Sequence, residues 1–228
     1  MKQVSLVIIF FLHAAFANCQ NYNSDSAIAV LKKQKDSTLR ATISADSAKI
    51  EKEFTEALRW EKLKGVTQYP YFKGNEFAGV IPVSGLTEIP DPNLEYKLLF
   101  ELVANNPDSV SKLANFSLVE VSRIINLHIA AGIPLKKISP VIVIHAEALK
   151  AFTHNGYYQG KYKTDNPNLK LIHELEAIGG RFIACGQALS FINLDREALL
   201  PEIKISLTAQ TVLSSYQMKG YVLYFIKP

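Results

Sequence analysis

The sequence has few of the residues and motifs that usually indicate a metal ion, a cofactor or a disulfide framework. Only two of its 228 residues are cysteine, Cys19 and Cys185, and two cysteines make no disulfide framework. No Cys-x-x-Cys pair, His-x-x-x-His pair or acidic cluster at ligand spacing occurs, so we expect no metal site. Gly-x-Gly-x-x-Gly, Walker-type and Gly-x-Ser-x-Gly loops are also absent. We therefore expect no nucleotide cofactor and no serine-hydrolase elbow.

The chain also lacks a strong excess of either charge. It has 25 Lys and Arg against 21 Asp and Glu, a net charge of +4. The excess is scattered and is not gathered with aromatic residues, which argues against nucleic-acid binding. No apolar run is long enough to span a bilayer. With 48% apolar residues, the composition is that of a globular protein with one domain and an extension.

The first residues have the pattern of an export signal. Lys2 supplies a positive charge, the run from Val4 to Leu12 is apolar apart from one serine, and residues 15–17 have the small-x-small form of a cleavage site. We interpret residues 1–17 as a signal peptide, with a buried first helix as the alternative. This interpretation predicts an exported protein, periplasmic or secreted. Cys19 follows the site, but the residues before it do not fit the lipoprotein pattern, so a lipid anchor is the minority interpretation.

The segment after the signal peptide predicts a linker and then a helix. Residues 18–45 are polar and rich in Ser, Asp and Lys, which predicts a mobile or partly helical linker. Residues 46–64 predict a helix, because Ile50, Phe54 and Leu58 recur every four residues. We expect this helix to pack on the domain or on a neighbouring subunit.

Proline and glycine dominate the next segment, residues 66–93. It contains four prolines and three glycines, interleaved with tyrosine and phenylalanine. Prolines at this density exclude a long helix or a central strand. We expect an ordered arm that crosses the domain surface, so that residues 18–93 form an extension made of linker, helix and arm.

From residue 94 to residue 228 the pattern alternates between strands and helices. We predict strands at 95–103, 141–144, 182–184, 203–206 and 221–226. We predict helices at 108–131, 167–178, 186–192 and 207–219. Single helices between strands imply right-handed crossovers and a parallel sheet. The sequence therefore predicts one three-layer, Rossmann-like α/β domain with a mainly parallel sheet of about five strands.

Two reactive side chains follow predicted strands of this domain. Reacting groups gather beyond the carboxyl ends of strands in open parallel sheets, and His145 and Cys185 each follow the end of a strand. Cys185 also begins a predicted helix, where free amide groups and the helix dipole favour a thiolate, and Gly186 allows a tight turn. This arrangement suits a nucleophile or a sulfur carrier. The alternatives are a small buried hydrophobic cysteine and a hydrogen-bonded structural histidine.

Several segments of this region carry a resemblance to a known family. They are residues 141–145, Asn166 ahead of the helix, residues 183–189 around Cys185, residues 199–201 and residues 217–221. In their order and spacing they resemble the DsrE/DsrF-like proteins, which include small sulfur-relay subunits. The arm ending in Pro90-Asp91-Pro92 is similar to the segment that precedes this domain in exported members.

The resemblance implies a Rossmann-like domain that assembles into oligomers, often trimers or hexamers, and a protein that donates or accepts sulfur as partner. In the sulfur-relay members, the cysteine that matches Cys185 carries sulfur as a persulfide. Cys185 and His145 are therefore the candidate catalytic residues, and Gly186, Gln187 and Asn166 the candidate binding residues. The alternative is a non-catalytic, oligomeric binding or assembly module of the same fold, in which Cys185 is structural.

Overall fold

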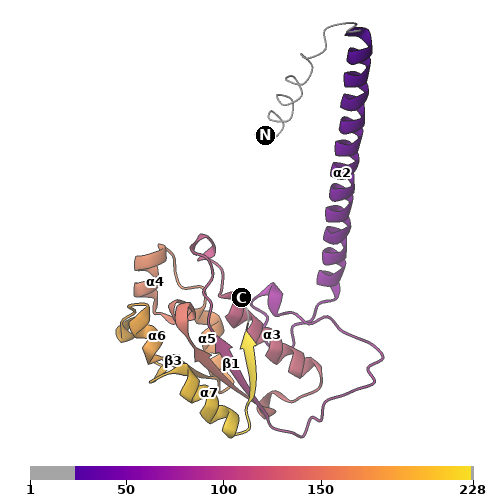
Figure 1. The fold of residues 1–228 in the computed structure, drawn as a ribbon. Helices are drawn as coiled ribbons and strands as arrows, with labels where there is room; N and C mark the ends of the chain where they lie inside the picture. Colours follow the sequence, from indigo (N-terminus) through magenta and orange to yellow (C-terminus); the bar gives the residue numbers. More distant parts are fainter. Residues whose placement is uncertain (1–23, 227–228) are drawn as a thin grey trace. The chain divides into compact units, whose positions relative to one another are not determined.

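The computed structural model describes residues 24–226 of the chain (Figure 1). The predicted signal peptide and Cys19 lie outside the described residues. The described chain contains a long helix, α2, and an α/β unit that begins at Leu63. Each of the two is described by itself.

Helix α2 runs from Ser24 to Val66. The predicted start at residue 46 was wrong, because residues 24–45 continue the same helix. No proline or glycine occurs between Ser24 and Lys64, and the segment is rich in Ala, Leu, Lys and Glu, which favour helix. Nothing local therefore ends the helix before Gly65. Every described side chain from Ile28 to Lys62 is exposed.

Five parallel strands form the sheet of the α/β unit, in the order β4-β3-β2-β1-β5. This confirms the predicted fold class and the predicted number of strands. The central strand β2 is almost entirely buried, as expected for a strand covered on both faces. The strands are β1 (Tyr96–Leu102), β2 (Ile138–Ile144), β3 (Arg181–Cys185), β4 (Lys204–Ser206) and β5 (Val222–Ile226).

Helices cover both faces of the sheet. Helices α3 (Phe116–Ala130) and α5 (Leu169–Ala177) lie on the connections from β1 to β2 and from β2 to β3, and they contact each other. Helix α7 (Ala209–Met218) returns the chain from β4 to β5 and packs on four of the strands. Because this return runs across the sheet in the opposite direction, right-handed crossovers place α7 on the opposite face. The unit therefore has three layers.

The helix predicted over 108–131 is divided in the structure. A 3-10 turn at Asp108–Val110 is followed by an irregular segment, and α3 begins only at Phe116. Asn115 is buried, and its side-chain oxygen accepts a hydrogen bond from the amide of Leu118 at 3.2 Å. This N-cap satisfies an amide at the start of α3 and fixes that start.

Two helical segments between β2 and β3 were not predicted from the sequence. They are a 3-10 segment, Ala146–Phe152, and helix α4, Asn155–Tyr162. Helix α4 contains two glycines, which disfavour helix in the absence of tertiary contacts. Its first turn is instead stabilised by His154, whose Nδ1 accepts a hydrogen bond from the amide of Tyr157 at 3.2 Å.

One buried asparagine anchors the proline-rich arm to α3. The amides of Tyr71 and Phe72 both donate to Asn126 Oδ1 at 3.0 Å. Asn126 Nδ2 donates to the carbonyls of Phe72 and Ala78 at 2.9 and 2.8 Å. Asn126 has no exposed surface. All four of these hydrogen bonds join α3 to one short stretch of the arm.

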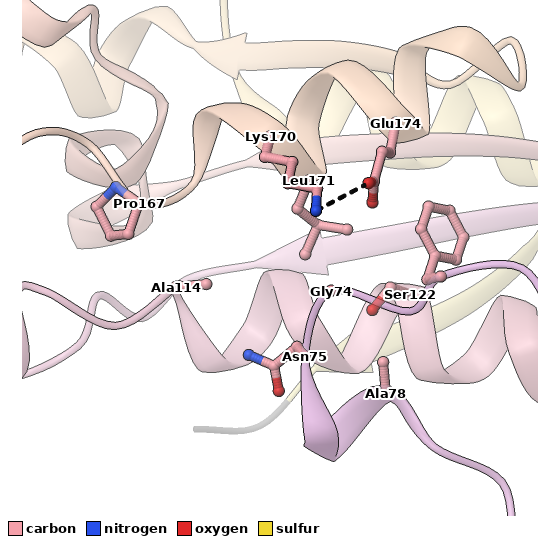
Figure 2. A pocket seen from close by; sticks show the side chains of 10 residues that line it. Gly74, Asn75, Ala78, Ala114, Ser122, Pro167, Lys170, Leu171 and Glu174 are labelled. Carbon is pink, nitrogen blue, oxygen red and sulfur yellow. Dashed lines mark ion pairs between the residues drawn. The ribbon is translucent and has the colours of Figure 1, made fainter. Parts of the chain in front are cut away.

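A small void lies where the arm meets α3 and α5 (Figure 2). Its volume is about 60 Å³, and Lys170 and Glu174 of α5 form an ion pair of 3.9 Å at its wall. Organic ligands need a pocket of roughly 300 Å³ or more. The void therefore holds water at most, and we assign it to the packing of the arm.

Candidate functional site

The structure places His145 and Cys185 next to each other, beyond the carboxyl ends of strands β2 and β3. Ile144 of β2 pairs with Ala184 of β3 in parallel register, and the two candidate residues directly follow this pair. The amide of His145 donates to the carbonyl of Leu102 at 2.8 Å, which continues the hydrogen-bonding pattern of the sheet. Neighbouring strands lie about 4.8 Å apart, so the two residues emerge side by side.

The thiol of Cys185 is closed off from solvent. The residue has no exposed surface, pairs with Ser206 of β4 and occupies the N-cap position of helix α6 (Gly186–Phe191). The amide of Gln187, in the first turn of α6, donates to the carbonyl of Leu207 at 3.1 Å. That amide is therefore not available to a thiolate. Chemistry at Cys185 requires a local opening around α6.

Gly186 allows α6 to begin close to β4. A Cβ atom added to Gly186 would lie 2.8 Å from the carbonyl oxygen of Ser206, which is closer than such atoms approach without displacement. Any other residue would push α6 away from β4. The role that the structure gives to Gly186 is thus to bring the backbone of α6 over the site.

A hollow of about 400 Å³ lies beside His145. This volume is that of a small-molecule site. Cys185 does not line this hollow. The thiol therefore lies near the hollow, but its sulfur is not exposed to it. The lining residues are His145, Ala146, Gln187, Ala188, Phe191, Ile192, Thr208 and Gln210.

The imidazole of His145, which lines this hollow, has a ring nitrogen whose hydrogen-bonding capacity is unsatisfied within residues 24–226. Its Nδ1 atom is buried and has no hydrogen-bond partner among the described residues. Buried polar atoms of native proteins nearly always have a partner. Because this atom has no accessible surface, a ligand or a water in the hollow would reach it only after a local movement of the site.

Asn166 lies away from this hollow, in the loops between β2 and α5. Its Nδ2 donates to the carbonyls of Ala151 and Thr153 at 3.0 and 2.6 Å, and its Oδ1 accepts from the amide and the Nδ2 of Asn168 at 2.9 and 2.8 Å. Its side-chain amide is thus engaged in holding the loops between β2 and α5. Asn166 does not line the hollow, and of the predicted binding residues only Gly186 and Gln187 lie next to Cys185 in the chain.

A cluster of charged and phenolic groups after β1 and β2 was not found from the sequence. Burial and the neighbouring Lys150 lower the pKa of Lys161. Burial and the charge of Asp108 raise the pKa of Tyr162 to about 12. The Tyr162 ring lies against Tyr158, with 4.5 Å between ring centroids. These residues come from separate loops and from the unpredicted helix α4, so no spacing in the sequence joins them.

The raised pKa of Tyr162 predicts a loss of stability at high pH. An unfolded tyrosine releases its proton near pH 10, whereas Tyr162 in the folded chain keeps its proton to about pH 12. The unfolded state therefore binds fewer protons in this interval, and the free energy of unfolding falls as the pH rises through it. We expect a smaller fall from about pH 9 to about pH 11 in Tyr162→Phe, measured by urea unfolding. An equal fall in both proteins would contradict this prediction.

Two kinds of site are not found within residues 24–226. No group of three or more His, Cys, Asp or Glu side chains in this range could hold a metal ion. No helix in this described range is both long and apolar enough to cross a membrane.

Comparison with known proteins gives a family match. A family model described as the DsrE/DsrF-like family matches residues 99–225, more than half of the chain. A protein of unknown function, MTH1491 from Methanobacterium thermoautotrophicum, is 18% identical to this chain, with a TM-score of 0.41. The match covers 57% of this chain and 98% of the MTH1491 chain. The ychN protein from E. coli is 13% identical with a TM-score of 0.41 and the same coverage of both chains. No curated protein matches the sequence.

Proposed function

Because the chain belongs to the DsrE/DsrF-like family, we propose that it handles sulfur and that Cys185 carries the sulfur as a persulfide. The observation that supports this role is the position of Cys185 beside His145 at the carboxyl edge of β2 and β3. The adjoining hollow of about 400 Å³ has room for a small donor or for the end of a protein side chain.

The proposed reaction is an exchange at sulfur. The Cys185 thiolate attacks the outer sulfur of a donor persulfide, R–S–SH. A new S–S bond forms at Cys185, the S–S bond of the donor breaks, and the donor leaves as the thiolate R–S⁻. Sulfur is delivered to an acceptor thiolate by the same step in reverse. His145, through the unpartnered Nδ1, would hydrogen-bond the incoming persulfide or move the proton between the two thiols.

We further propose that the chain is exported and works as a homo-oligomer with a sulfur donor or acceptor protein. Export rests on the leader-like pattern of residues 1–17. The oligomer and the partner rest on the family. Burial of Cys185 suits a carrier that protects a persulfide between transfers and opens near α6 to exchange it.

The test is sulfur loading measured by intact-protein mass spectrometry. After exposure to a small-molecule persulfide, we expect one added sulfur on the parent chain and on Cys19→Ser, and none on Cys185→Ser. We expect His145→Ala to load about a hundredfold more slowly, the low end of the contribution of a positioned proton-transfer group. His173→Ala is the matched control, because His173 lies on α5 with an exposed side chain. Loading that is unchanged in Cys185→Ser would overturn the proposal.

The full burial of Cys185 favours a second candidate function, a binding or assembly module in which the thiol only packs. Under this alternative, iodoacetamide modifies Cys185 only when the fold is lost, and the rate follows global unfolding. Under the carrier proposal, modification occurs through local opening and is faster than global unfolding allows. Comparing the alkylation rate with the unfolding rate at increasing urea concentrations separates the two.

A further inference from the structure

The hollow beside His145 differs from other cavities of the α/β unit in the charge of its lining. The residues of the described range that line it include no Lys, Arg, Asp or Glu. Four other cavities of this unit each have at least one such residue, namely Lys170, Arg196, Lys136 and Glu120. A charged molecule that leaves water for an uncharged surface loses hydration and gains no ion pair. The hollow therefore suits an uncharged molecule better than an ion.

An exposed aromatic ring gives the hollow an apolar surface. Phe191 of α6 lines the hollow, and 86% of the residue is exposed. Ala146, Ala188 and Ile192 continue this apolar surface. An aromatic or aliphatic group placed against the ring would remove apolar surface of both partners from water.

Two side-chain amides supply the polar part of the lining. Gln187 of α6 and Gln210 of α7 both line the hollow, and both are exposed. Neither side chain makes a hydrogen bond to another residue of the described range 24–226. A carboxamide donates and accepts hydrogen bonds but carries no charge. These groups are therefore able to bind a neutral polar group, such as an amide.

The size of the hollow favours a free small molecule over the end of a protein side chain. Its volume of about 400 Å³ lies within the range of small-molecule sites, roughly 300–1,000 Å³. A cysteine persulfide from a partner protein would bring in only a methylene group and two sulfurs. Most of the hollow would then stay unfilled.

We propose that the hollow binds the sulfur donor, and that this donor is a small persulfide, R–S–SH, with an uncharged aromatic or aliphatic group R. The donor role rests on the proposed function, because the outer sulfur passes to Cys185. After the local opening that the buried thiol requires, the Cys185 thiolate attacks this sulfur. The S–S bond of the donor breaks, Cys185–S–SH forms, and the donor leaves as R–S⁻. An uncharged hollow also favours the neutral form R–S–SH over its anion, and the neutral form is the one that a thiolate attacks at the outer sulfur.

Two donors of the same shape test the charge preference. The para-carbamoylbenzyl persulfide is neutral in its R group, and the para-carboxybenzyl persulfide carries a negative charge there. Loading of the full chain is followed by intact-protein mass spectrometry in a Cys19→Ser background. Each rate is divided by the rate of the same donor with a neutral free thiol, N-acetylcysteinamide, which removes differences in intrinsic reactivity.

We expect the neutral donor to load Cys185 about tenfold faster than the charged donor after this correction. The expected ratio is smaller than full burial of an unpaired charge would give, since the hollow is partly open. Equal corrected rates, or a faster charged donor, would overturn the proposal and leave the carrier role of Cys185 standing.

Binding is measured apart from sulfur transfer with the methyl thioethers of the same two R groups, which have no sulfur to transfer. Isotope-labelled alanine methyl groups of the full chain provide the signal in NMR spectra, and Ala146 and Ala188 report on the hollow. We expect these two signals to shift at about tenfold lower concentrations of the neutral thioether than of the charged one. Such binding without sulfur loading would remove the carrier role and leave the hollow as a site for uncharged ligands. Signals that shift with neither compound would overturn the proposal.

A pair of aromatic variants locates the bound R group. Phe191→Ala is expected to raise the dissociation constant of the neutral thioether about fivefold, because part of the apolar contact is lost. Phe77→Ala is the matched control, since Phe77 is 68% exposed and lines a different hollow. It is expected to bind the thioether as the parent does. Equal weakening by the two variants would show that R does not lie against Phe191.

A pair of lysine variants tests the charge of the lining directly. Gln210→Lys is expected to speed loading by the charged donor about threefold, the effect of a partly exposed ion pair. Gln217→Lys adds the same charge near the other end of α7, away from the hollow, and is expected to leave this rate unchanged. Equal effects of the two substitutions would overturn the proposal, because the donor would then respond to the net charge of the protein and not to the hollow.

Discussion

Replacement of Asn126 by leucine is expected to lower the free energy of unfolding by about 3 kcal/mol and to release the arm from α3. The substitution removes all four hydrogen bonds between the Asn126 side chain and the arm. Each buried backbone group left without a partner costs about 1–3 kcal/mol. Part of this cost is recovered as the arm moves and water reaches the freed groups, so the expected loss is well below the sum.

Urea unfolding measures the loss of stability, and limited proteolysis measures release of the arm. We expect new cleavage between Tyr69 and Phe77 in Asn126→Leu under conditions that leave the parent intact. Asn93→Leu is the matched control, since Asn93 is an exposed residue of the same arm. Equal stability and equal protease resistance in Asn126→Leu and Asn93→Leu would show that the clamp does not hold the arm.

The order of the strands along the chain could be predicted because it depends on short-range patterns. The aliphatic run of β2 and the glycine that ends α3 are visible in the sequence, and the structure confirms a parallel five-stranded sheet. The break before α3 could not be predicted in this way. It depends on the buried Asn115, whose amide donates to Asn168 Oδ1 at 2.6 Å from a segment 53 residues away.

The candidate site shows the same division between local and long-range information. The ends of β2 and β3 are local features, and parallel pairing then places His145 beside Cys185. Burial of the thiol depends instead on long-range contacts. Strand β4 and the carbonyl of Leu207 come later in the chain than α6, and they pack against Cys185 and α6 only in the folded structure. A sequence pattern in which a helix begins at a cysteine therefore predicts where the thiol lies. It does not predict whether the amides of that helix, or solvent, can reach the thiol.

Replacement of Asn166 by alanine is expected to lower the free energy of unfolding by about 2–4 kcal/mol. Asn166 has only 4% of its surface exposed, and its amide joins the carbonyls of Ala151 and Thr153 to Asn168. Asn168 in turn accepts the amide of Asn115 at the start of α3. The loss of Asn166 thus leaves buried groups without partners and loosens the connection between two helices.

The exposed Gln187 provides the matched comparison, because Asn166 and Gln187 were predicted as binding residues on the same grounds. Gln187 lines the hollow beside His145, and its side chain makes no hydrogen bond to another residue of the described range 24–226. We expect Gln187→Ala to keep the stability of the parent within about 0.5 kcal/mol and to change the rate of sulfur loading. Asn166→Ala is expected to do the opposite below its unfolding transition, with the loading rate preserved. If Asn166→Ala instead keeps its stability and loses loading, Asn166 belongs to the site and the site extends beyond the hollow, towards the loops between β2 and α5.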